Sequence, residues 1–305
     1  MVKKHKNLVA AAAVVILLLV LPAVLGKYNV YILTKIIILS LYAVAFNILL
    51  GFTGLLSFGH ALFFSGAAYT VAICLVKLSL PLWLSLVLAV AVVLVLSAAT
   101  GFLSLRHHDI HFALITLSLS MLFWGLAMKW RSVTGGEDGI TGISRMMSLH
   151  QYYYLVLPLA VGCILIIYRM LHSNFGLLLE GLRENETRVS FSGHSVVKYR
   201  MYAMILSAFF TAIAGMLWLF VDGGINPNTS HWTFSAVPVI ASLIGGPAYF
   251  TGPIIGVIVY MLAMEIITSY TLYWQLFLGI VIVMVVLFFR GGIVGSFKVL
   301  LGGEK

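Results

Sequence analysis

The chain has 305 residues, of which 62% are hydrophobic and 9% are charged, and its mean hydropathy is +1.11. Soluble globular domains carry about 25% charged residues, so this composition excludes them. A net charge of +9 would suggest nucleic acid for a soluble protein, but here the charges lie between long apolar runs. They therefore indicate orientation in a membrane, and we expect a protein surrounded by membrane lipid with no nucleic-acid partner.

The apolar runs are unbroken over about 17 to 25 residues, which predicts helices and excludes the alternating strands of a barrel. The fold class is therefore all-α, a polytopic membrane protein with about ten transmembrane helices and helix breaks. The first run, residues 8–25, is longer than a signal-peptide core and no A-x-A site follows it, so it is interpreted as a span. The spans are expected at residues 8–25, 30–50, 60–76, 80–105, 111–130, 152–171, 201–221, 234–244, 252–268 and 272–289.

The positive-inside rule predicts which connections face the cytoplasm. Most of the lysines and arginines fall on one side of the expected spans, so both termini and the polar stretch 172–200 are expected to be cytoplasmic. Within this stretch, apolar residues recur at helical spacing, which predicts a short helix along the membrane surface. Asn185 can cap a short second helix, Glu186 suits the positive first turn of that helix, and Gly193 is a natural stop. Ser195 offers a cap for the next span. An ordinary solvated loop is the alternative.

Three glycines, at 51, 54 and 59, interrupt the apolar sequence before His60. Non-helical backbone at membrane depth is tolerated where protein or a cavity covers it, and such breaks often mark a substrate route. Close helix packing is the alternative for the glycines, and an interhelical hydrogen bond is the alternative for His60. Packing is favoured for Gly245, Gly246 and Pro247. The candidate pathway residues are Gly54, Ser57, Phe58, Gly59 and His60.

Two further polar segments are candidates for sites. The loop 134–142 (TGGEDGITG) is rich in turn residues and carries two adjacent acids. A calcium loop needs more oxygen ligands, so we expect contact with a partner on the outer face, through Thr134, Gly135, Gly136 and Asp138. His107, His108 and His111 suggest a metal site, but no further ligand is near them and an interfacial loop is the better interpretation.

Catalytic motifs are absent from the sequence. It contains no GxxxxGK[ST] phosphate loop, so the chain is not expected to hydrolyse ATP, and no HExxH or GxSxG motif that would indicate an enzyme. Cys74 and Cys163 lie in apolar runs and act as small hydrophobic residues. We expect no catalytic residue, no metal and no cofactor in this chain.

Several segments in order resemble one family, the LivM-type permease subunits of branched-chain amino acid ABC importers. They are NILLGFTGLLSFGHALFFSGAAYT (residues 47–70), LRHHDIHFALITLSLS, TGGEDGI, SNFGLLLEGLRENETRVSFSGHS, LIGGPAYFTGPIIG and VLFFRGGIVG, and they extend from about residue 40 to residue 295. The resemblance implies one permease domain over residues 1–305, with a coupling region at 172–200 that docks on an ATPase subunit. The residues that it assigns to this coupling are Arg183, Glu184, Asn185, Glu186, Thr187, Arg188 and Gly193.

The resemblance also implies an assembly in the bacterial inner membrane. It contains a second, LivH-like permease, two ATPase subunits that bind the ATP, and a periplasmic binding protein that delivers the substrate. That substrate is a branched-chain amino acid or a related small polar solute. Related permeases import urea, short amides or aromatic acids, and the sequence does not separate these ligands. An ion-coupled carrier and an intramembrane enzyme are rival classes, although no acid is expected at mid-span.

Overall fold

The computed structural model describes residues 18–107, 109–143, 147–271, 273–288 and 291–300. Within these ranges the chain is an all-α membrane protein, as expected, and six of its helices are long and apolar enough to cross a membrane. These six are α2 (Lys27–Thr53), α4 (Leu82–Ser104), α5 (Asp109–Lys129), α7 (Leu149–Leu171), α10 (Val196–Asp222) and α12 (Gly252–Tyr270). Three apolar helices are shorter: α3 (His60–Val76), α11 (Trp232–Gly245) and α13 (Trp274–Phe288).

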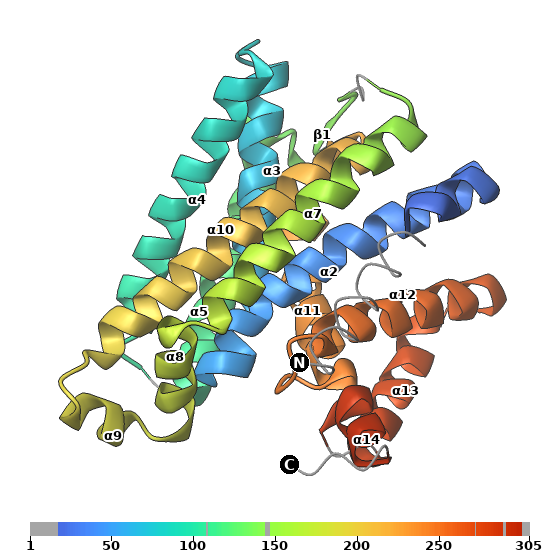
Figure 1. Ribbon diagram of the computed structural model, residues 1–305. Coiled ribbons are helices and arrows are strands. Elements are labelled where there is room, and N and C mark those ends of the chain that lie inside the picture. The colour runs from blue at the N-terminus through green and yellow to red at the C-terminus, as the bar shows by residue number, and fades with distance from the viewer. Residues whose placement is uncertain (1–17, 108, 144–146, 272, 289–290, 301–305) are drawn as a thin grey trace.

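The small elements gather at the two ends of the bundle (Figure 1). At one end, called here the α9 end, lie α8 (Asn174–Glu184) and α9 (Glu186–Phe191). At the opposite end, called the β end, β1 (Ile140–Thr141) pairs antiparallel with β2 (Gly224–Ile225). The remaining elements are α6 (Arg131–Thr134), the 3₁₀ helices η1 (Gly136–Asp138) and η2 (Pro227–Ser230), and α14 (Gly292–Leu300).

Each span expected from residue 30 onward coincides with a described helix, and the ends differ by a few residues. The expected span at 8–25 falls mostly outside the described residues, as does His108. Three of the expected spans, including those at 60–76 and 234–244, coincide with helices shorter than the hydrocarbon core. At 1.5 Å per residue the 17 residues of α3 and the 14 of α11 measure about 25 and 21 Å, less than the roughly 30 Å hydrocarbon core. The start of α3 is buried in the bundle, whereas the first two residues of α11 are exposed and its burial begins at Ser235.

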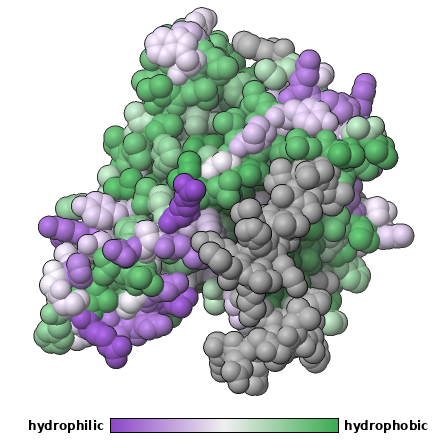
Figure 2. Space-filling model, in the orientation of Figure 1, coloured by the Kyte–Doolittle hydropathy of each residue, from purple (hydrophilic) through white to green (hydrophobic). Residues whose placement is uncertain are grey.

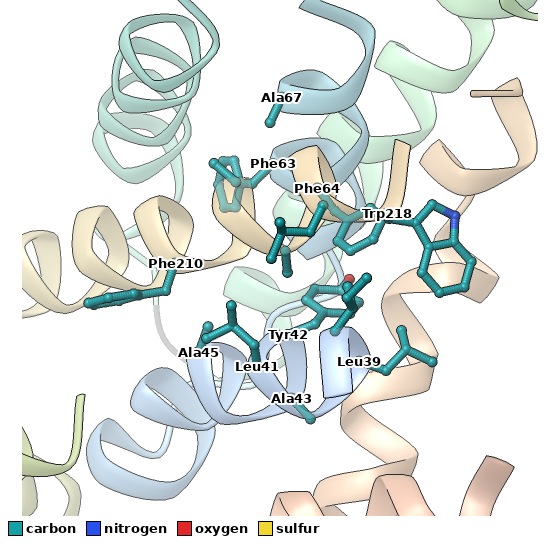
Figure 3. Close-up of a cluster of buried hydrophobic side chains, with 14 of the residues drawn as sticks. Leu39, Leu41, Tyr42, Ala43, Ala45, Phe63, Phe64, Ala67, Phe210 and Trp218 are labelled. Carbon is teal, nitrogen blue, oxygen red and sulfur yellow. The ribbon is translucent and has the colours of Figure 1, made fainter. Parts of the chain in front are cut away.

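The centre of the bundle is built from α2 and α10, which lie side by side with α7 along the molecule (Figure 1). Aromatic side chains fill the space where α2 and α10 meet the short helices (Figure 3). The ring of Phe64 on α3 lies 4.9 Å from that of Tyr42 on α2 and 4.9 Å from that of Phe234 on α11. Trp218 on α10 packs edge-on against Phe64 at 5.9 Å. These contacts join both short helices to the two central ones.

Glycines bring helix backbones into direct contact. A Cβ placed on Gly215 of α10 would lie 2.1 Å from the carbonyl oxygen of Phe64 on α3. One placed on Gly256 of α12 would lie 1.7 Å from the carbonyl oxygen of Ala241 on α11. No other residue type fits at such an approach. Gly245, whose Cβ would meet Gly252 O at 1.7 Å, packs in the same way, which supports the packing interpretation of this glycine.

The two central helices are followed by matching chain reversals. Each has 27 residues and ends at a left-handed glycine, Gly54 with φ +75° after α2 and Gly223 with φ +71° after α10. After each glycine the chain turns back into the bundle and starts a short helix, through the irregular segment 54–59 in the first half and through β2 and η2 in the second. Helix α3 runs toward the β end, where Lys77 donates to the carbonyl of Ser132, and α11 runs toward the α9 end. The two halves of the bundle therefore repeat one motif in opposite directions.

Candidate translocation pathway and coupling region

The predicted break after α2 is present in the structure. Helix α2 ends at Thr53, and the N–H of Leu55 donates to Leu49 O at 3.2 Å, which closes the last turn around Gly54. The backbone then runs without regular structure through residues 54–59 until α3 begins at His60. The ring of Phe46 lies 4.9 Å from that of His60, so α3 begins about two helical turns, roughly 10 Å, inside the end of α2.

His60 is fully buried, and both of its ring nitrogens have partners. Ser207 Oγ donates to Ala45 O at 2.6 Å, so this hydroxyl accepts from His60 Nε2 at 2.8 Å. Nδ1 then accepts from Ser57 Oγ at 3.1 Å, and Ser57 Oγ accepts from Gly59 N–H at 3.2 Å. This closed set of bonds suits a neutral imidazole. A proton on Nδ1 would remove the acceptor that the hydrogen of the Ser57 hydroxyl uses.

Hydroxyl groups from distant helices satisfy the backbone around the start of α3. Phe58 N–H donates to Thr116 Oγ1 on α5 at 3.2 Å, and Ala61 N–H donates to Ser235 Oγ on α11 at 2.8 Å. The N-terminal N–H groups of a helix have no partner within the helix, so these hydroxyls replace water at a buried helix start. The start of α3 thus meets the start of α11 through the Ser235 side chain.

Thr116, Ser207 and Ser235 are site residues that the sequence did not reveal. They lie 58, 147 and 174 positions from their partners, and each stands in an apolar helix where a hydroxyl usually bonds to its own turn. The structure brings Ser57, Phe58, Gly59 and His60 together with them in one packed junction. A pocket of about 150 Å³ lies elsewhere, between α3, α4 and α5, with an apolar lining that includes Tyr69 and Phe123.

The coupling region forms two short helices, as the local signals predicted. Ser173 accepts from Phe175 N–H at 3.3 Å at the start of α8, and Asn185 accepts from Arg188 N–H at 2.9 Å at the start of α9. Glu186 occupies the first turn of α9, and Gly193 follows its end with φ +86°. The expected cap at Ser195 differs: the residue holds the N-cap position of α10, but its side chain makes no capping bond.

Three contacts fix α8 and α9 to the bundle. Leu179 and Leu182 of α8 are buried, so its apolar face packs against the bundle rather than lying free. Arg183 at the end of α8 donates to the carbonyl oxygen of Gly51, in the last turn of α2. Glu186 of α9 forms an ion pair with the buried Arg200 in the first turn of α10. The region is therefore attached to both central helices.

The outer face of this region is polar with one large apolar residue. Figure 2 shows the hydrophilic surface over α8 and α9 at the lower left, beside the apolar surface of the spanning helices. Glu184, Thr187 and Arg188 are exposed there. Phe191, the last residue of α9, is 87% exposed. An exposed aromatic side chain on a polar surface is typical of a binding anchor, and the sequence analysis had not singled it out.

The loop at the β end is more closely packed than a free loop. Thr134 is buried and donates to Ala127 O at 2.6 Å, and Gly136 is also buried. Gly135 has φ +83°, a conformation that favours glycine. Asp138 is exposed, together with Glu137. Thr134, Gly135 and Gly136 therefore shape the loop, and Asp138 is the member of the predicted set that a partner can reach directly.

A charged pair also lies at the β end. Lys35, in the third turn of α2, has its Nζ 2.8 Å from Asp222 Oδ1 at the end of α10 and 4.5 Å from the centre of the Trp218 ring. Tyr31 donates to the same carboxylate oxygen at 2.7 Å. The Asp222 carboxylate is thus paired with the Lys35 ammonium and accepts a hydrogen bond from the Tyr31 hydroxyl. The pair ties the β ends of the two central helices together.

Comparison with known proteins supports the transport assignment. The family model described as "Branched-chain amino acid transport system / permease component" matches residues 28–286. The LivM permease protein of a high-affinity branched-chain amino acid transport system from Salmonella typhimurium is 26% identical over 292 residues, which covers 85% of this chain and 68% of the relative. Its counterpart from Escherichia coli is 25% identical over 288 residues, with the same coverage.

Part of the chain is also similar to a permease of the LivH type. A probable LivH permease protein from Methanocaldococcus jannaschii is 29% identical over 117 residues, which covers 38% of this chain and 36% of the relative. No solved structure matches the chain significantly. The family match covers most of the sequence, including both central helices and the coupling region. The chain belongs to the family of permease components of branched-chain amino acid transport systems.

Proposed function

We propose that this chain is the membrane permease subunit of an ATP-driven importer of branched-chain amino acids and that it acts without catalysing a reaction itself. Family membership supports the substrate class, and the absence of a phosphate loop from the sequence supports separate ATPase subunits. The observation that carries the proposal is the α8–α9 surface. It is a capped, polar element with an exposed Phe191, and it is attached to α2 and α10.

The assembly follows from this arrangement. Two ATPase subunits bind at the α9 end, which faces the cytoplasm, and a LivH-like permease pairs with this chain in the bacterial inner membrane. A periplasmic binding protein delivers the amino acid at the β end, where Asp138 and Glu137 are exposed. The ATPases close when they bind ATP and thereby move α9. Rigid-body movement of the helices around a pathway between the two permeases then alternates access to the two sides.

Purification of the tagged chain from its own membrane, with identification of the co-purifying subunits by mass, tests this proposal. The expected result is an assembly with a second permease and two ATPase subunits. Proteoliposomes that contain the assembly and the binding protein should take up radiolabelled leucine. This uptake should require ATP on the side of the membrane where α9 lies. A chain that takes up leucine as a homodimer, driven by an ion gradient and without ATPases, would refute the proposal.

A further inference from the structure

The last turns of α2, residues 47–54, contact parts of the chain that lie far apart in the sequence. We call this segment the junction turn. Its Gly51 carbonyl accepts a hydrogen bond from Arg183 of the coupling region. Its Asn47 Nδ2 donates to Pro247 O, just beyond the end of α11, at 3.0 Å. Its final residue, Gly54, starts the segment that leads to His60 and α3.

The contact from the coupling region is direct and specific. The carbonyl of Gly51 lies in the last turn of α2, where carbonyl groups have no intrahelical partner, and the Arg183 guanidinium supplies a charged donor there. The aliphatic stem of the same arginine crosses the break, since a Cβ on Gly54 would lie 3.2 Å from Arg183 Cγ. A shift of α8 therefore acts on the junction turn through both the stem and the guanidinium.

The contact toward α11 is equally close. A Cβ placed on Gly51 would lie 2.4 Å from Pro247 O, so α2 and the chain after α11 touch at the backbone. Asn47 is 2% exposed, and its amide donates to that same carbonyl. Displacing the junction turn thus displaces the C-terminal end of α11. On its other side the same displacement pulls residues 54–59, which hold the start of α3 through the His60 network.

We infer that the junction turn transmits movement of the coupling region to the two short helices, α3 and α11. Arg183 is the positioning residue that receives this movement, and Asn47 is the one that passes it to α11. This inference rests on the proposed importer function. One turn of α2 adjoins the chain ends of α3 and α11, whereas the ion pair between Glu186 and Arg200 attaches α9 only to the start of α10. Arg183 and Asn47 touch neither substrate nor ATP in this scheme.

The test uses the complete importer in proteoliposomes and measures leucine uptake and ATP hydrolysis together. Arg183→Met keeps the aliphatic stem and removes the donor to Gly51 O, and Arg183→Lys restores a charged donor. Arg169→Met makes the same chemical change at an exposed position in the last turn of α7, outside the coupling region. Asn47→Leu keeps a branched side chain of similar size and removes the donor to Pro247 O.

The inference predicts that R183M lowers the leucine transported per ATP about tenfold, the scale of one lost charge-assisted hydrogen bond, while assembly and ATP hydrolysis persist. R183K and R169M should retain the ratio of the unmodified importer. N47L should lower the ratio as R183M does, and the double variant should be no worse than the stronger single variant, because both act on one relay.

Two results would overturn the inference: an unchanged ratio in R183M, or an equal loss in R183M and R183K. If R183M failed to assemble, the N47L variant would decide, since an unchanged ratio in N47L removes the relay to α11. Failure of the proposed function looks different, because the unmodified importer would then take up leucine without its ATPases.

Discussion

Gly54→Ala is the most informative single change in the break, because its cost can be worked from the structure. Gly54 has φ +75°, and an L-residue in the left-handed region costs about 1–2 kcal/mol. At about 2–4 °C per kcal/mol, the melting temperature of the chain should fall by about 2–8 °C. The new Cβ would lie 3.2 Å from Arg183 Cγ, closer than the usual 3.5–4.0 Å carbon contact, so it also pushes the arginine away from Gly51 O.

Gly223→Ala provides the matched control. Gly223 ends α10 with φ +71°, so alanine pays a similar backbone cost, but its Cβ would meet Ile143 O at an ordinary 3.6 Å. Both variants should therefore melt at similarly lowered temperatures, measured by thermal unfolding of the purified importer. Leucine transported per ATP should fall in G54A and persist in G223A. Equal ratios in the two variants would refute the reasoning and leave backbone strain as the whole effect.

Three further predictions concern the coupling region and the buried histidine. Glu186→Arg opposes the buried Arg200 of α10 and should uncouple uptake from ATP hydrolysis, whereas adding Arg200→Glu restores the ion pair with its charges exchanged and should recover coupling; a double variant as uncoupled as Glu186→Arg in the proteoliposome assay would count against the ion pair. Phe191→Ala should leave the melting temperature unchanged and weaken ATPase binding about 30-fold, the effect of a 2 kcal/mol anchor, while Leu177→Ala on α8 should do neither; a pull-down titration that shows no loss for F191A would remove its anchor role. His60→Ala leaves two serine hydroxyls without their partner and should destabilise the chain by about 3 kcal/mol, so a melting temperature equal to that of the unmodified protein would contradict the network.

Local signals in the sequence predicted the elements whose causes are local. Asn185 caps α9 because a short side chain three residues before an N–H can reach it, and Gly54 ends α2 because glycine accepts positive φ. The long helices followed from uninterrupted apolar runs. The break before His60 was recognised from its glycines for the same reason.

Contacts between distant segments could not be predicted in this way. Nothing in the sequence near Ser207 or Ser235 indicates that these hydroxyls bond to groups near residue 60, since serines in apolar helices commonly bond within their own turn. The segments 60–76 and 234–244 are predicted as spans because their residues are apolar, although both helices are short for a membrane crossing. The resemblance places Arg183 only in the set of residues that contact the ATPase. Its bond to Gly51 O could not be predicted, because it depends on how α8 packs against α2.

The close glycine contacts decide which parts of this protein travel together. Gly215 holds α10 against the backbone of α3, and Gly256 holds α12 against that of α11, so neither pair can slide or separate without losing a contact at backbone distance. The short helix α3 therefore moves with α10, and the short helix α11 moves with α12. Where α3 meets α11, the Ala61 N–H to Ser235 hydroxyl bond is of a kind that water can replace. Movement of α3 with α10 relative to α11 with α12 would therefore have to break that hydrogen bond and repack Phe64 against Phe234, whose rings lie 4.9 Å apart.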